Sequence, residues 1–197
     1  MIDPLYNLLR HLTSPIVAIT TSAGGRRNGM IANSAQRASL VPSLPRVSVY
    51  ISKTNFSHDL VYSSGLLGLH LLRGDQYDVI AQLGLSSGRD GDKLGKIELR
   101  EGITGCPLLV DCRAAFECRV VNAMDAGAAT FFLADIVGVE EPAPDAPVMT
   151  SDIFRSDMPA DLRAIYEARL IAAQQELTPL AGNVARENTW PGPTAMA

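Results

Sequence analysis

The chain has 197 residues, of which 47% are apolar and 19% charged, a composition that excludes extended disorder and is typical of one globular domain. Its net charge of −4 and its lack of a Lys/Arg cluster argue against nucleic acid or an anionic membrane as the main partner, which leaves small molecules. No apolar run could span a membrane, no basic leader precedes the apolar residues at the start, and Cys106, Cys112 and Cys118 are too few for a disulfide framework, so we expect a cytoplasmic protein with buried thiols.

The first half of the chain alternates helices with short strands. Leucines and an isoleucine near helical spacing predict a helix over residues 2–12, which Ser14-Pro15 ends. Residues 15–21 are β-branched and apolar, and after a turn they predict a hairpin with the strand that begins near residue 28. Residues 46–52 alternate as a half-buried strand does, with Val47, Val49 and Ile51 on one face. The remaining elements are a helix over 55–63, a strand over 66–72 and a helix over 76–83.

The second half begins with a polar loop over residues 86–96. Two long strands, 107–124 and 128–140, follow around a turn at 125–127 and should pair as an antiparallel hairpin. Apolar residues between 162 and 171 predict a C-terminal helix, and residues 189–197 should form a loose tail. Strands separated by turns, with helices at the margins, predict a mostly antiparallel barrel.

The segment "NGMIANSAQRASLVP" (28–42) starts as a strand but then carries five polar side chains before Pro42: Asn33, Ser34, Gln36, Arg37 and Ser39. A single serine there would most often satisfy a neighbouring backbone group. The concentration of donors is instead typical of a segment that grips a flat, polar, phosphorylated ligand.

A second polar cluster, "SKTNFSHD" (52–59), joins a predicted strand to a predicted helix. The free amides at the start of a helix favour a phosphate, and Ser52, Lys53, Asn55 and Ser57 could add to them. In the alternative, Asn55 and Ser57 only cap the helix and Lys53 is a solvated surface charge. The residues alone leave both interpretations open.

Other site types have little support. The three histidines, His11, His58 and His70, are scattered and the cysteines have no ligand-pair spacing, which argues against a metal site. The loop "DGDK" (90–93) lacks the further ligands of a calcium loop, so we interpret it as a solvated turn. No P-loop, dinucleotide fingerprint or nucleophile elbow occurs, and we expect no catalytic acid or base.

Taken in order, "PIVAITT", "NGMIANSAQRASLVP", "RVSVYIS", "KTNFSHDL" and the long hairpin resemble the flavin reductase-like family over roughly residues 10–140. The most specific part is the spacing from "GM-x-A-x-S-x-x-x-S-x-x-P" to "K-x-N-x-S". The resemblance implies a mainly β fold, a six-stranded antiparallel Greek-key split barrel with peripheral helices. It also implies a homodimer that binds FMN, or FAD as the alternative, in a groove by the subunit interface.

Carried over to this sequence, the resemblance places Met30, Ile31, Ala32, Asn33 and Ser34 along the isoalloxazine ring and ribityl chain. Gln36, Arg37 and Ser39 would lie toward the ribityl and phosphate. The phosphate end would be closed by four residues of the second cluster and their neighbours, with one lysine of the later loop nearby: Ser52, Lys53, Asn55, Ser57, His58 and Lys93. Domain boundaries follow as a flavin-binding domain over 1–150, a C-terminal helix over 151–180 packing on the barrel or the dimer partner, and a tail over 181–197.

One position departs from the family pattern. Many reductases of the family have Gly-Asp-His where this chain has Gly127, Ala128 and Ala129, and that His lies where nicotinamide docks. His58 and His70 could replace it, although a His near a helix cap and an outward-facing strand His are the simpler interpretations. The resemblance predicts an oxidoreductase that passes hydride from NADH or NADPH to flavin N5, with a monooxygenase as a further partner. The alternatives are a flavin-binding or electron-transfer protein that does not use nicotinamide, and a barrel without ligand that serves as an interaction module.

Overall fold

The computed structural model describes residue 12 and residues 15–194, so the helix predicted over residues 2–12 lies almost entirely outside the described residues. The strands are β1 (Val17–Ala23), β2 (Arg26–Ala32), β3 (Gln36–Arg37), β4 (Arg46–Ser52), β5 (Leu66–Leu71), β6 (Leu99–Glu101), β7 (Pro107–Leu109), β8 (Ala114–Asp125) and β9 (Ala129–Glu140). The helices are α2 (Phe56–Ser64), α3 (Tyr77–Gly84), α4 (Ser151–Ser156), α5 (Ala160–Leu177) and the short η2 (Thr178–Leu180).

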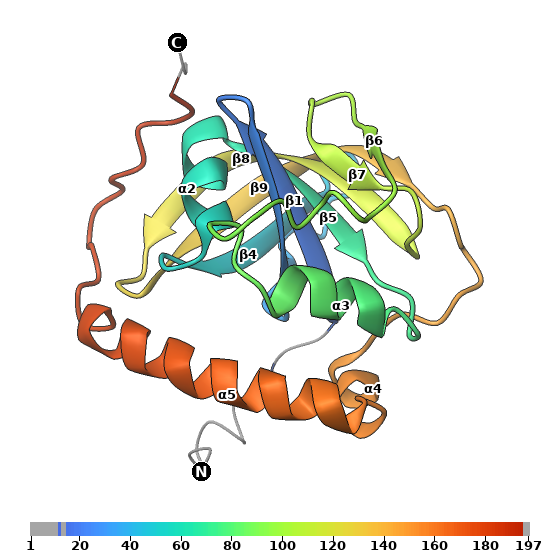
Figure 1. Cartoon of the computed structure of the whole chain (residues 1–197). Coiled ribbons are helices and arrows are strands. Elements are labelled where there is room, and N and C mark those ends of the chain that lie inside the picture. Colours follow the sequence, from blue (N-terminus) through green and yellow to red (C-terminus); the bar gives the residue numbers. More distant parts are fainter. Residues whose placement is uncertain (1–11, 13–14, 195–197) are drawn as a thin grey trace.

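Seven strands form one antiparallel sheet in the order β2-β1-β5-β8-β9-β4-β3. Its two edge strands, β2 and β3, are consecutive in the chain and are joined by residues 33–35 alone. Three residues span only about 10 Å, so the sheet must curl until its edges approach each other. The curled sheet is a half-barrel with the helices outside it (Figure 1). The antiparallel, mainly β architecture is confirmed, while the predicted count of six strands is wrong because the two-residue β3 adds a seventh.

Two apolar cores lie on opposite sides of the sheet. The inner core fills the curl with alternate residues of the strands, including Ile19, Ile51 and Phe132, each 0% exposed. The predicted alternation of β4 is confirmed, since Val49 and Ile51 are buried while Tyr50 is exposed. The outer core packs α3, α4 and the start of α5 against the other face of β1. Burial on both faces explains why β1 begins with three apolar residues in a row, Val17, Ala18 and Ile19.

The hairpin of β8 and β9 is the longest element of the sheet. The two strands pair antiparallel from Ala115 with Glu140 to Asp125 with Thr130, which confirms the predicted hairpin. Two register shifts interrupt the pairing, between Glu117 and Cys118 and between Val120 and Asn122. Such bulges increase local twist and bend, so they help the hairpin to follow the curl.

Three sequence expectations are corrected. The strand predicted over 107–124 is two strands, because the chain bends at 110–113, where the backbone of Arg113 donates to Leu71 and Gln76 donates to the carbonyl of Asp111. As a result, β7 leaves the main sheet and pairs with β6, a strand that the sequence pattern does not show. The C-terminal helix expected over 151–180 is divided into α4 and α5, with residues 157–159 between them.

The third correction concerns the tail. Residues 189–194 have no regular structure, but they are not loose. The indole of Trp190 donates to the carbonyl of Tyr62 at 3.0 Å and packs against the inner core, and the Thr194 amide donates to Ser63 at 2.9 Å. Helix α5, in contrast, contains the whole of the predicted 162–171 helix and is longer at both ends.

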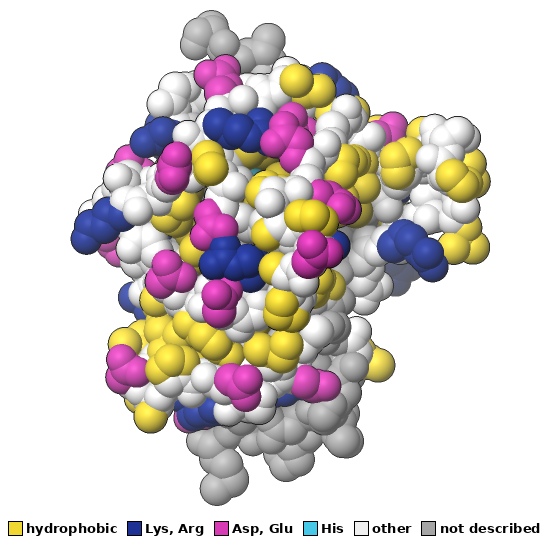
Figure 2. Space-filling model, turned by 90° about the vertical axis from the view of Figure 1, so that its right-hand side faces the viewer, with side chains coloured by type: hydrophobic (Ala, Val, Ile, Leu, Met, Phe, Trp, Pro, Cys, Tyr) yellow, Lys and Arg dark blue, Asp and Glu magenta, His cyan; other side chains and the backbone are white. Residues whose placement is uncertain are grey.

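On the face drawn in Figure 2, acidic, basic and apolar side chains are interspersed, without a large area of one sign. Among the described residues, no helix is both long enough and apolar enough to cross a membrane.

The three cysteines are fully buried, as expected, and the structure generates a prediction about them. Burial raises the pKa of the Cys112 thiol to about 11 and that of Cys118 to about 12, and it also raises the pKa of Cys106. Because the thiolate is the reactive species, a disulfide reagent such as DTNB should label none of the three in the native protein and all three in guanidinium. A Ser43→Cys variant, whose new thiol is exposed, provides the positive control. Rapid labelling of the native wild-type chain would show that at least one of these cysteines is accessible and not buried.

Candidate functional site

A pocket of about 400 Å³, which we call the basic pocket, lies between the barrel and α5. Its inner wall comes from β2, the start of α2 and the loop after α3, and its outer wall comes from α5. The lining residues are Asn28, Met30, Thr54, Asn55, Phe56, Ser57, Gly84, Leu85, Ser86, Ser87, Gly88, Arg89, Lys93, Tyr166, Arg169, Leu170, Ala172, Ala173 and Glu176. Three of these side chains are cationic and one is anionic, so the lining carries a formal charge of 3 − 1 = +2.

Lys93 is the buried cation of this pocket, with only 7% of its surface exposed. Its ammonium donates to the carbonyls of Leu83 and Ser86, and within the described part of the chain it has no ion pair with a carboxylate. Burial, with a further contribution from the charge of Arg169, lowers the pKa of Lys93 to about 8. The loop that the sequence suggested was a solvated turn therefore places a charge inside the protein.

The start of α2 faces the same pocket. The first amides of a helix have no partner within it, and here the N-cap residue Asn55 makes no side-chain cap. The side-chain amide of Asn28, on β2, donates to the hydroxyl of Ser57 at 2.8 Å, and this bond fixes the position of that hydroxyl. The amides of a helix start and the positive end of the helix dipole make this a place where an anion is stabilised.

Arg89 reaches the pocket from the loop after α3. Its guanidinium donates to the carbonyl of Thr54 at 2.8 Å and lies 5.7 Å from the ring centre of Phe56. These contacts hold the loop against the start of α2 and bring a second cation toward Lys93.

A second pocket of about 320 Å³, the histidine pocket, lies along another side of α2, near the β8–β9 turn. It is lined by Lys53, His58, Asp59, Tyr62, Ala123, Asp125, Thr130, Thr189 and Trp190. Lys53 forms an ion pair with Asp125 at 2.7 Å, and this bond, more than any other contact, holds the pKa of the Asp125 carboxyl below its usual range. The charge of Lys53 is thus already compensated.

His58 is buried in the histidine pocket, with its Nε2 2.8 Å from the Thr130 hydroxyl and its Nδ1 2.9 Å from Asp59. Thr130 follows Ala129, the position where the family has its His. Ala129 itself is 0% exposed and pairs with Ser52 in the sheet. The fold therefore brings an imidazole from α2 beside this position.

The sequence suggested that His70 is an outward-facing strand residue, but its side chain is fully buried. The Leu109 amide donates to its Nε2 and its Nδ1 lies 3.2 Å from the carbonyl of Ala18. Burial lowers the pKa of His70 to about 4, so its imidazole is neutral and serves to join β1, β5 and β7.

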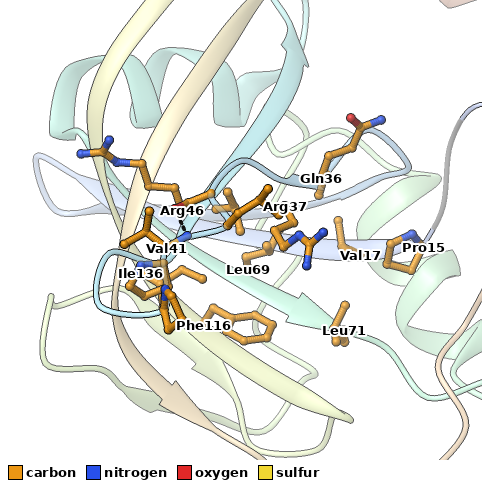
Figure 3. A pocket seen from close by; sticks show the side chains of 16 residues that line it. Pro15, Val17, Gln36, Arg37, Val41, Arg46, Leu69, Leu71, Phe116 and Ile136 are labelled. Carbon is orange, nitrogen blue, oxygen red and sulfur yellow. Dashed lines mark hydrogen bonds between the residues drawn. The ribbon is translucent and has the colours of Figure 1, made fainter.

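A third pocket of about 480 Å³, the apolar pocket, opens at the end of the inner core. Its walls are mainly apolar side chains such as Leu69, Leu71 and Phe116, and Gln36, Arg37 and Ser39 also line it. Figure 3 shows Arg37 reaching among the apolar side chains while Gln36 points away from them. No hydrogen bond or ion pair of the Arg37 guanidinium occurs with any residue that the structure describes.

The expected site residues are therefore divided among the three pockets. The basic pocket gathers Met30, Asn55, Ser57 and Lys93, the histidine pocket takes Lys53 and His58, and the apolar pocket takes Gln36, Arg37 and Ser39. Five line none of the three: Ile31, Ala32, Asn33, Ser34 and Ser52. Of these, Ser34 donates to the carbonyl of Tyr50 at 2.8 Å and Ala32 is part of the inner core.

Sequence reasoning missed two parts of the basic pocket. Residues 86–89 were seen as a polar loop, although two serines and a glycine before an arginine could have signalled an anion-binding turn. Arg169 and its neighbours on α5 gave no local signal, because only the fold brings them to residues 80 positions earlier.

The family model described as "flavin reductase like domain" matches residues 9–154. A ferric-chelate reductase (NAD(P)H) of Archaeoglobus fulgidus is 30% identical over 67% of this chain and 78% of its own length. A high molecular weight rubredoxin of Moorella thermoacetica is 31% identical over 65% of this chain, but the match spans only 56% of that protein. The solved structure of an FMN-binding protein from Thermus thermophilus has a TM-score of 0.59 at 28% identity and covers 64% of this chain and 70% of its own.

The buried charge of Lys93 predicts an unusual pH dependence of stability. Its pKa is about 8 when folded and near 10.5 when unfolded, so between these values Lys93 binds more protons in the unfolded chain and its contribution to the free energy of unfolding should rise with pH. The buried cysteines, whose pKa values are raised, contribute in the opposite direction at high pH, so the Lys93 contribution is read as the difference between wild type and Lys93→Met. The rise attributable to Lys93 is up to about 3 kcal/mol. Denaturant titrations at pH 7.5, 9 and 10.5 measure it, with Lys93→Met lacking this component and the exposed control Lys96→Met keeping it. The same change in the free energy of unfolding with pH in wild type and Lys93→Met would show that Lys93 is not buried as a cation.

Proposed function

The chain belongs to the flavin reductase-like family, and we propose that it is an oxidoreductase that binds FMN with the phosphate in the basic pocket. The names of its relatives support a redox role, since one is a ferric-chelate reductase (NAD(P)H) and one solved neighbour is an FMN-binding protein. Because the match spans about half of the rubredoxin relative, the acceptor and partners of such proteins are not carried over to this chain.

One observation carries the proposal: the buried ammonium of Lys93 has no carboxylate partner among the residues that the structure describes, and it shares a pocket with Arg89 and the start of α2. A buried charge is costly unless it is paired. A phosphate would pair with it and would accept hydrogen bonds from helix-start amides and the Ser57 hydroxyl. The donor set of the pocket therefore fits a phosphate monoester. We assign the phosphate to this pocket rather than to Arg37 or Lys53, which line the other two.

The ring of the flavin would extend from this pocket along β2. Asn28 and Met30 line the pocket from that strand. The strand ends at Ala32, and Asn33 and Ser34 follow it in the link between the sheet edges. Small side chains with free backbone groups suit a flat ring that has a polar edge and two apolar faces. We retain the resemblance-based role of these residues as part of the proposal.

A bound flavin supplies the hydride chemistry at its own N5, so the chain need only bind, orient and shield it. In the basic pocket, Arg89 and Lys93 would hold the phosphate, and the Asn28 amide orients the Ser57 hydroxyl for the same task. Because the flavin itself would supply the chemistry, the chain needs no catalytic acid–base pair, and its sequence contains no motif for one.

Whether nicotinamide supplies the hydride depends on the region around Ala129. The methyl group there provides no donor, and the nearest imidazole, that of His58, already contacts Thr130. This favours a second candidate function, a flavin carrier that is reduced by another protein. We retain NADH or NADPH as the proposed reductant, and the homodimer and a monooxygenase partner stay predictions.

The phosphate assignment predicts a selective loss in one variant. Lys93→Met should weaken FMN about tenfold or more, because it removes a charge-assisted contact, and should leave riboflavin, which lacks the phosphate, within about twofold. Quenching of flavin fluorescence gives both dissociation constants, with Lys96→Met as the matched control. Equal losses for FMN and riboflavin would place the phosphate elsewhere.

Reduction by nicotinamide separates the two candidate functions. Anaerobic stopped-flow mixing of the FMN-loaded protein with NADH, and separately with NADPH, should bleach the flavin absorbance within seconds if the chain is a reductase. Persistence of oxidised flavin for minutes with both nucleotides, while dithionite still reduces it, would establish the carrier instead.

A further inference from the structure

The part of the chain that follows the family match, beyond residue 154, wraps around the barrel. Figure 1 shows α5 running beneath α3 and the tail then rising along the side of the molecule past α2. This C-terminal strap, residues 160–194, passes the basic pocket through α5 and the histidine pocket through Thr189 and Trp190.

The strap is attached at both of its ends. At its start, Leu162 is buried in the outer core and the ring of Tyr166 meets that of Phe154 edge to face at 5.2 Å. After α5, Val184 pairs with Ala126 at the β8–β9 turn. Further on, Trp190 is held by the inner core and by its hydrogen bond to Tyr62.

Gly127 shows how closely the second attachment is fitted. It has a φ of +79°, and a Cβ added there would lie 2.7 Å from the carbonyl oxygens of both Leu180 and Ala181. The turn and the strap are therefore in direct backbone contact at this point.

Between its attachments, α5 is barely packed. Leu162, at its start, is its only buried residue. The middle of the helix instead faces the basic pocket, with Leu170, Ala172 and Ala173 as a wall and Arg169 beside them. Within the described part of the chain, the contacts that hold the helix thus lie at its ends, and its middle borders the cavity.

Three of the four charged side chains that line this cavity are cations. The positive charge of Arg169 acts on Lys93 from the α5 side, and Arg89 adds a third cation from the loop. Glu176, the one carboxylate of the lining, lies two turns beyond Arg169 on α5. Arg169 has no ion pair within the described residues. A small dianion between α5 and α2 would relieve this repulsion.

We propose that α5 is the end wall of the flavin site, that Arg169 binds the FMN phosphate from outside the barrel, and that the wall excludes the adenylate half of FAD. The inference rests on the proposed function, since it assumes that the phosphate lies in the basic pocket. FAD would need to continue from its first phosphate through the space that Leu170, Ala172 and Ala173 occupy. The chain would thus select the mononucleotide by a segment that lies outside the family domain.

The test measures the dissociation constants of riboflavin, FMN and FAD on the full chain. Wild type should bind FMN at least about tenfold more tightly than FAD. Arg169→Ala should weaken FMN about tenfold with riboflavin unchanged, and Arg169→Lys should recover part of the loss. Arg186→Ala, which removes an exposed guanidinium from the same strap away from the pocket, is the matched control and should change nothing.

A second variant tests the wall itself. Trp190→Ala removes the attachment of the strap to the inner core without changing a residue of the basic pocket. It should raise the affinity for FAD and so reduce the ratio of the FAD and FMN dissociation constants. Melting curves confirm that each variant is folded. Equal wild-type affinities for FMN and FAD, or parallel losses of FMN and riboflavin in Arg169→Ala, would overturn the inference and leave the flavin site standing. Failure of all three flavins to bind wild type would overturn both.

Discussion

The burial of one uncompensated ammonium group is the constraint on which the site depends. Lys93 is held by two backbone carbonyls, which satisfy donors but do not neutralise its charge. Carbonyl dipoles reduce the cost of such a charge, and an anion would remove most of it. The neighbouring groups, Arg89 and the first amides of α2, have the same electrostatic preference. Positive potential that is concentrated in a partly closed cavity favours the binding of an anion.

The curl of the sheet decides which residues share that cavity. Because β2 and β3 are its opposite edges and only residues 33–35 connect them, the polar segment after Gly29 crosses from one side of the barrel to another. Asn28 and Met30 consequently line the basic pocket, whereas Gln36 and Arg37 border the apolar pocket. Residues that are adjacent in a motif can therefore serve different surfaces.

The C-terminal strap adds a second layer to this arrangement. The family match ends at residue 154, yet α5 supplies the outer wall of the basic pocket and the tail supplies part of the histidine pocket. A helix held at its ends and unpacked in its middle leaves room for a ligand beneath it. The family domain and the strap thus form the cavities jointly.

Local patterns in the sequence were sufficient for most elements. The alternation of Val47, Val49 and Ile51, the long β8–β9 hairpin and the apolar spacing of α5 follow from side-chain periodicity, which depends only on near neighbours. The family motif likewise places Asn55 and Ser57 at a helix start. Tertiary structure alone decided that Lys93 is buried, that Asp125 neutralises Lys53 and that Arg169 faces the pocket. Each of these depends on groups distant in the chain, and the balance between desolvation and pairing that sets a charge's role is determined only when the fold brings them together.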